Sequence, residues 1–172
     1  LSATQKVNAM SLYDLASVTK VAASANLLMQ AKDLGKYKLT DTLGKLEPNW
    51  QFTNKTSLAM AEWMTHQAGL PAFIPFYTKW NLRDTKHPLI ADSLSNQFTL
   101  EVAKNVYAYN DLPALIFDSV LQTPLNGRGQ YKYSDLGYGF GQYLLEQWNQ
   151  KPLNEQFESD IALPMGLRTM TY

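Results

Sequence analysis

The stretch Leu12–Lys20, LYDLASVTK, places Ser17 three residues before Lys20. The apolar run VAASANLLM follows directly, which predicts a helix over roughly residues 17–33 that ends at Gly35. Residues i and i+3 share one face of a helix, so the amine of Lys20 can reach the hydroxyl of Ser17. The helix N-terminus adds backbone N–H groups that favour a developing oxyanion. One interpretation of this stretch is therefore a serine nucleophile with a base one turn away.

Taken alone, the Ser-x-x-Lys spacing favours a structural interpretation, because serine and lysine are both common and this spacing occurs by chance. Ser17 is then a helix N-cap, and Lys20 is a solvated residue of the first turn. A lysine acts as a general base only when burial or nearby positive charge lowers its pKa. The strongly apolar sequel to Lys20 indicates such a buried setting, and a solvated lysine is more often followed by a mixed helix face.

Composition restricts the classes of function. The chain has 172 residues, 45% of them apolar and 17% charged, which suits one globular domain with a single core. Its 15 basic and 15 acidic residues include no basic run, so no nucleic-acid partner is expected. Cysteine is absent, which excludes disulfides and a thiolate nucleophile. Only two histidines, His66 and His87, are present, so no Ser-His-Asp triad and no metal or other cofactor is expected. No run of apolar residues is long enough for a membrane span.

Helical periodicity dominates the rest of the chain, and strand signals are nearly absent. Ser57 is the predicted N-cap of a short helix, whose apolar face is formed by Met60, Ala61, Trp63 and Met64 and ends at Gly69 and Pro71. Residues 72–98 mix aromatic residues with prolines, which predicts a long loop with one short helix. The pattern predicts a mainly α structure, with longer helices over roughly residues 17–33, 100–107, 112–121, 134–148 and 153–161.

The nucleophile stretch, extended to LYDLASVTKVAA, resembles the corresponding segment of serine β-lactamases and penicillin-binding proteins, particularly the class C-like branch with DD-peptidases and carboxylesterases. Further segments resemble later landmarks of that family in the same order. They are GKYKLTDTLGKLEPNW (35–50), MAEWMTHQAGLPA (60–72), YKYSDLGYGFGQYLLE (131–146) and LPMGLRTMTY (163–172). The resemblance implies the helical region of the α/β serine β-lactamase/DD-peptidase-like fold. It also implies an acyl-serine hydrolase that acts on a peptide, β-lactam or ester bond.

The resemblance assigns roles to four residues. Ser17 is the acylated nucleophile, Lys20 is its base partner, and Tyr133 is the tyrosine of the second motif, which relays protons. A phenol is a poor base in water, but a neighbouring ammonium stabilises its phenolate. Whether Lys20 or Tyr133 takes the serine proton stays open, and the structural alternative for Tyr133 is a core tyrosine with a bonded hydroxyl. Asp135 replaces the usual asparagine and is the predicted substrate-binding residue. Its carboxylate either accepts a hydrogen bond from a substrate donor or pairs with Lys20 instead.

Other motifs are given structural readings. Tyr109–Asp111 (YND) also has the Tyr-x-acid form, but it lacks the LGYG helix start that follows Tyr133. The glycines of GYGFG (137–141) do not follow a strand, so helix packing is favoured over a nucleotide loop. His66 is predicted to fix the turn before Gly69 by hydrogen bonds rather than to act in catalysis.

The third family motif, Lys/His-Thr/Ser-Gly, does not occur in the sequence, and the chain begins at Leu1 rather than at methionine. We therefore expect residues 1–172 to form a single partial β-lactamase-like domain without most of the family's antiparallel sheet, weak or inactive when isolated. The alternative function is a non-catalytic helical binding module or an inactive fragment. The expected partner is a small-molecule or peptide-like substrate, and exposed helix faces predict self-association. By resemblance, the protein is expected in the periplasm or outside a bacterial cell.

Overall fold

The computed structural model of the chain describes residues 6–9 and 11–170, so the last two residues of the landmark 163–172 lie outside it. The chain forms two compact units. The terminal unit comprises residues 1–37 and 141–172, and the central unit comprises residues 38–140. The assignment of the whole chain to one partial domain stays a prediction. No helix in the described ranges combines the length and the apolar character needed to cross a membrane.

The predicted helix after the nucleophile stretch is confirmed, but its first turns are wider than expected. A π-helix, Lys20–Ser24, runs directly into α1, Ala25–Asp33. The side-chain amide of Asn26 donates to the carbonyl oxygens of Val21 (2.9 Å) and Ala22 (3.0 Å). These bonds satisfy backbone acceptors in the widened segment, where the regular i→i−4 ladder is interrupted.

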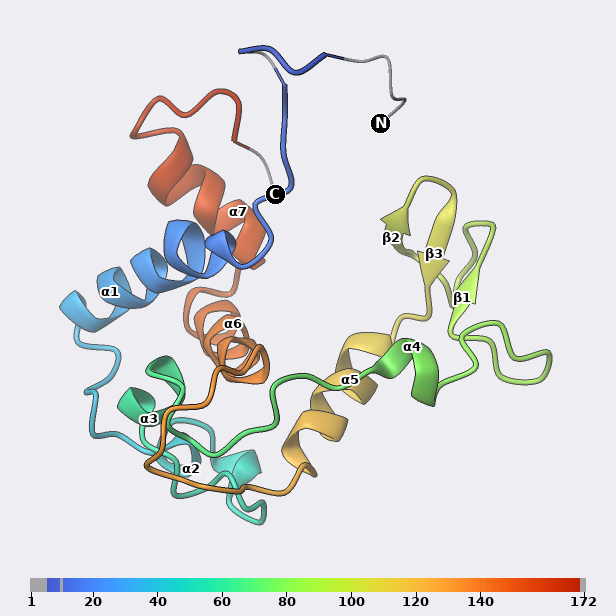
Figure 1. Cartoon of the computed structure of the whole chain (residues 1–172). Coiled ribbons are helices and arrows are strands. Elements are labelled where there is room, and N and C mark those ends of the chain that lie inside the picture. Colours follow the sequence, from blue (N-terminus) through green and yellow to red (C-terminus); the bar gives the residue numbers. More distant parts are fainter. Residues whose placement is uncertain (1–5, 10, 171–172) are drawn as a thin grey trace. The chain divides into compact units, whose positions relative to one another are not determined.

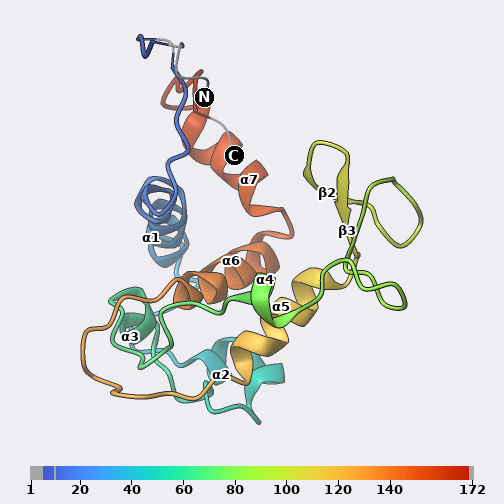
Figure 2. The same cartoon turned by 45° about the vertical axis from the view of Figure 1, so that its right-hand side comes forward.

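The terminal unit is built from α1, the C-terminal part of α6, and α7, Leu153–Phe157, which continues as a π-helix, Glu158–Ala162. Figures 1 and 2 show α1 and α7 side by side. Tyr37, which follows α1 in the chain, contacts two helices of the unit. Its hydroxyl donates to Leu28 O of α1 at 3.0 Å, and its ring stacks on that of Trp148 of α6, with 5.6 Å between the ring centroids. The buried amide nitrogen of Gln156 donates to Leu145 O and Lys151 O, so it is hydrogen-bonded within the core.

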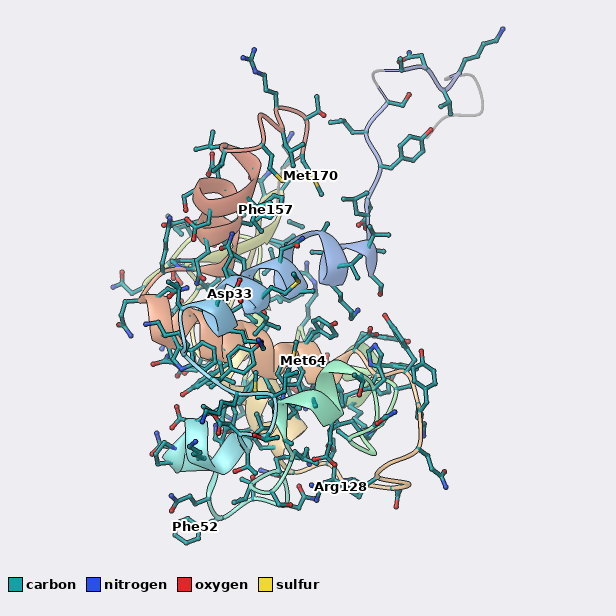
Figure 3. The ribbon with its side chains drawn as sticks, turned by 90° about the vertical axis from the view of Figure 1, so that its left-hand side faces the viewer. Asp33, Phe52, Met64, Arg128, Phe157 and Met170 are labelled. Atoms are coloured by element: carbon teal, nitrogen blue, oxygen red, sulfur yellow. The ribbon has the colours of Figure 1, made fainter. Side chains whose placement is uncertain are left out.

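Short helices and an aromatic core make up the central unit. Its helices are α2 (Leu43–Leu46), a 3₁₀-helix (Pro48–Trp50), α3 (Met60–Met64), α4 (Phe76–Lys79) and α5 (Leu112–Leu121), followed by the start of α6 (Leu136–Asn149). Phe140 of α6 lies in the core, with its ring centroid 5.6 Å from Trp50, 5.9 Å from Phe117 and 6.4 Å from Trp63. This core packs the first turn of α6 against α3 and α5. At the surface of the same unit, the side chain of Phe52 points away from the ribbon (Figure 3).

The predicted helix over residues 100–107 is wrong, and the near absence of strands was overstated. This region forms β2 (Leu100–Ala103) and β3 (Val106–Ala108), which build an antiparallel sheet with β1 (Ile90–Ala91) in the order β1-β3-β2. Asn105 makes the turn between β2 and β3 with φ 59°, a conformation that asparagine tolerates better than most residues. The fold is thus mainly helical with one small sheet.

Candidate active site

Ser17 and Lys20 are in direct contact within the terminal unit. Lys20 Nζ donates to Ser17 Oγ at 2.9 Å. Ser17 is exposed just before the first helical residue, whereas Lys20 is half-buried at the start of the π-helix. An accessible hydroxyl with an amine at hydrogen-bonding distance is the geometry that an activated serine requires.

A strained turn precedes the serine, and sequence reasoning missed it. Ala16 has φ 44°, in the left-handed region that non-glycine residues seldom adopt. The N–H of Ala16 donates to Asp14 Oδ1 at 2.8 Å, which is an Asx-turn. The N–H of Val18 then bonds to Leu15 O and that of Thr19 bonds to Ala16 O, at 2.9 and 3.1 Å. The turn therefore reverses the chain directly at Ser17; an aspartate two residues before the turn was the only local signal for it.

Tyr133 and Asp135 end a loop of the central unit that runs beside residues 66–72. Tyr133 is 41% exposed, and Asp135 is also exposed. Backbone N–H groups of the loop donate at 2.8 Å to carbonyl oxygens of the facing segment, in the pairs Asn126–Gly69, Gly129–Gln67, Lys132–His66 and Asp135–Ala72. Gly69 has φ 71°, and a Cβ there would lie 2.9 Å from Asn126 O and Arg128 N. Only glycine allows this close approach of the two segments.

An ion pair between Arg128 and Glu62 attaches the same loop to α3. Arg128 donates from Nε to Glu62 Oε1 at 2.6 Å and from Nη2 to Glu62 Oε2 at 2.8 Å. The hydrogen bond from Arg128 is the largest influence on Glu62 and lowers the pKa of its carboxyl. The predicted N-cap Ser57 is wrong, because α3 begins after Ala59 and the Ser57 hydroxyl accepts from Arg128 Nη1 instead.

The hydroxyl of Ser134 makes two hydrogen bonds at the start of α6. Its buried Oγ donates to Pro71 O at 2.6 Å and accepts from the N–H of Leu136 at 3.2 Å. Ser134 therefore lies just before α6 and bonds to one of the helix's first N–H groups, as a capping side chain does. Because it also bonds to Pro71, the start of α6 and the end of the loop share one attachment.

Tyr109, the tyrosine of the YND motif, lies between β3 and α5. A hydrogen bond to Asp111 is the main cause that raises the pKa of the Tyr109 phenol. A raised pKa disfavours the phenolate that a proton-accepting tyrosine would need. Tyr109 is therefore poorly suited to accept a proton from a serine.

The four predicted site residues are divided between the units. Ser17 and Lys20 belong to the terminal unit, whereas Tyr133 and Asp135 belong to the central unit. The structure brings the first pair into contact and places the second pair on one loop; the assembly of all four into one site stays a prediction. Within residues 6–9 and 11–170, no group of three or more His, Asp or Glu side chains is arranged to hold a metal ion.

Comparison with known proteins gives consistent matches. The family model described as Beta-lactamase matches residues 1–172. A protein of Salmonella gallinarum named "Putative D-alanyl-D-alanine carboxypeptidase" is 28% identical over 165 residues, which cover 91% of this chain and 33% of the relative. The relative of the same name in Escherichia coli K12 is 26% identical over 170 residues, covering 94% of this chain and 34% of its own length. The chain thus spans about a third of the length of these relatives.

Solved structures with similar folds include an amidase and a beta-lactamase. The D-amino acid amidase of Ochrobactrum anthropi matches with a TM-score of 0.63 and 19% identity, covering 96% of this chain and 40% of the amidase. A class C beta lactamase of Rhodobacter sphaeroides matches with a TM-score of 0.59 and 18% identity, covering 88% and 34% of the two chains. At these identities, the matches show a shared fold.

Proposed function

We propose, from the premise that this chain belongs to the beta-lactamase family, that it carries the nucleophile and the proton relay of an acyl-serine hydrolase. The observation that carries the proposal is the 2.9 Å contact between Lys20 Nζ and Ser17 Oγ. Ser17 is the nucleophile, Lys20 is its base partner, and Tyr133 relays protons. The mechanism requires the hydroxyl of Tyr133 to lie within hydrogen-bonding reach of Ser17 or Lys20 in the reacting enzyme.

The reaction proceeds in two steps. Ser17 Oγ transfers its proton to Lys20 or to the phenolate of Tyr133 and attacks the carbonyl carbon of the substrate. The resulting tetrahedral intermediate expels an amine or alcohol, which takes its proton from the relay, and leaves an ester on Ser17. Water, deprotonated by the same relay, then hydrolyses this ester and regenerates the serine hydroxyl. No cofactor is needed for either step.

The substrate is proposed to be a small molecule or peptide with a D-amino acid at the scissile bond. The names of the curated relatives and of the amidase with a similar fold support this class, with β-lactams and esters as alternative acyl donors. Asp135 would accept a hydrogen bond from an N–H of the substrate, because an ionised carboxylate can only accept.

Members of this family are typically periplasmic or extracellular, and we propose that location here. Exposed Val18, Val21 and Met29 support the prediction of self-association.

Covalent labelling tests the proposal. In the full-length protein, a fluorophosphonate or penicillin probe should label one serine, and Ser17→Ala should abolish the labelling. Ser11→Ala, a change at the serine just before the stretch Leu12–Lys20, is the matched control and should leave the labelling intact. If Ser17→Ala is labelled as rapidly as the parent, the nucleophile is elsewhere; if neither protein is labelled, the chain is the non-catalytic module.

A further inference from the structure

We infer that His66 is a positioning residue that holds Tyr133 in place for the proton relay; the inference rests on the proposed function. Sequence reasoning assigned His66 only to the turn before Gly69. The structure gives this residue contacts with Tyr133 itself and with both of its chain neighbours. All of these contacts lie within the central unit.

His66 bonds to the backbone on both sides of Tyr133. The N–H of Lys132 donates to the carbonyl oxygen of His66 at 2.8 Å. The N–H of Ser134 donates to His66 Nδ1 at 3.3 Å. One residue therefore restrains the peptide groups before and after Tyr133, which limits the rotation that would swing the phenol away.

The imidazole also packs on the phenol ring. The ring centroids of His66 and Tyr133 are 4.5 Å apart, with 40° between the planes. Tyr131 and Tyr138 lie at 6.0 Å from the same imidazole, at 88° and 40°. Tyr133 is 41% exposed, and the imidazole packs against one side of its ring.

The backbone of His66 is itself strained. Its φ of 60° places it in the left-handed region, where histidine is tolerated better than most residues but still at a cost. Strained residues of this kind persist where surrounding contacts hold them, and they cluster at functional sites. Here the strain turns the Nδ1 atom and the carbonyl oxygen of one residue toward the same segment.

In the hydrogen bond with Ser134, His66 Nδ1 is the acceptor. An Nδ1 atom that accepts from a backbone N–H carries no proton, so the neutral ring has its proton on Nε2. His66 therefore acts here as an acceptor that holds a peptide group. Its role in the reaction is exerted through Tyr133.

The loop has attachments that do not involve His66. The ion pair of Arg128 with Glu62 remains when the imidazole is removed, as do the backbone bonds at Gly69 and Gln67. Variants at position 66 should therefore fold, which makes the inference testable. His66→Gly removes the ring and the acceptor without strain at φ 60°, whereas His66→Asn restores an acceptor oxygen close to the place of Nδ1 and also tolerates this φ.

The experiment compares His66→Gly, His66→Asn and the control Gln67→Gly with the parent in the full-length protein. His66→Gly should lower kcat about 10- to 100-fold with KM changed less than about threefold, because a displacement near 1 Å of a reacting group has effects of this size. His66→Asn should recover most of the loss, and Gln67→Gly should behave as the parent. In hydrogen exchange, the amide of Ser134 should exchange about tenfold faster in His66→Gly and be protected again in His66→Asn.

Two results would overturn the inference. The first is a parental kcat in His66→Gly; the second is a loss of kcat that His66→Asn does not recover while the amide of Ser134 is protected. Failure of the proposed function has a different signature, namely no labelling of Ser17 in the parent. In that case, hydrogen exchange at Ser134 alone decides whether His66 holds the Tyr133 segment.

Discussion

Lys20 Nζ and Ser17 Oγ lie 2.9 Å apart across the start of one helix. The contact is local, because three residues of helix bring two side chains onto the same face. It places an amine where a proton can pass from the serine in a single step. The left-handed Ala16 just before it holds the serine at the outside of a sharp turn.

Replacement of Lys20 tests whether its side chain acts as a base or only supplies a positive charge. Lys20→Met and Lys20→Arg should each slow acylation of Ser17 by about 10²-fold or more, since a guanidinium cannot lose its proton at neutral pH. The rate of probe labelling measures the effect. Lys32→Met, at an exposed lysine in the last turn of α1, is the control and should label normally. Normal labelling of Lys20→Arg would show that Lys20 acts only through its charge.

Removal of one oxygen tests the role of Tyr133. Tyr133→Phe keeps the ring contact with His66 and should lower kcat about 10²- to 10⁴-fold, the usual range for loss of a general acid–base group. The melting temperature should not change, because the side chain is partly exposed. Tyr131→Phe changes a more exposed tyrosine of the same loop and should retain activity. Equal rates for the two variants would exclude the relay.

The strain at Ala16 predicts opposite effects of a smaller and a branched residue. Ala16→Gly should raise the free energy of unfolding by up to about 1 kcal/mol, because glycine adopts φ 44° without a Cβ clash. Ala16→Val should lower it and should also slow labelling of Ser17. Urea denaturation of both variants measures the first effect. A destabilised glycine variant would show that the turn is not strained.

Buried Lys55 predicts a dependence of stability on pH. Its ammonium donates to Asn54 Oδ1 at 2.6 Å and to Thr123 O at 2.5 Å, and burial lowers the pKa of Lys55 to about 8. Between this value and the unfolded pKa near 10.4, the unfolded chain binds more protons, so stability contributed by Lys55 rises with pH. Relative to Lys55→Met, the parent should gain up to about 3 kcal/mol over this window. Denaturation at pH 7.5 and pH 10 measures the change, and a constant difference between the two proteins would contradict it.

The sequence predicted those features that depend on neighbouring residues. The helix after Ser17 and the helices α5 and α6 follow from apolar periodicity, and the reach of Lys20 to Ser17 follows from helical spacing. The five ordered landmarks indicate the family. Each of these signals is contained in a short window of the chain.

Errors arose where the partner of a segment is distant in the sequence. The predicted helix at residues 100–107 is a hairpin, because β3 pairs with β1 as well as with β2 and backbone bonding to a distant strand outweighs weak local propensity. Ser57 bonds to Arg128 rather than to its own helix, for a similar reason.

By itself, the sequence determined the family, the main helices and the local pair of Ser17 with Lys20. Only the tertiary structure decided that His66 bonds to the peptide groups on both sides of Tyr133, and that Glu62 holds the loop through Arg128. These contacts join residues that lie 66 and 68 positions apart. Local periodicity carries no information about such contacts, because their geometry depends on how the chain folds back on itself and on which polar groups then have to be satisfied.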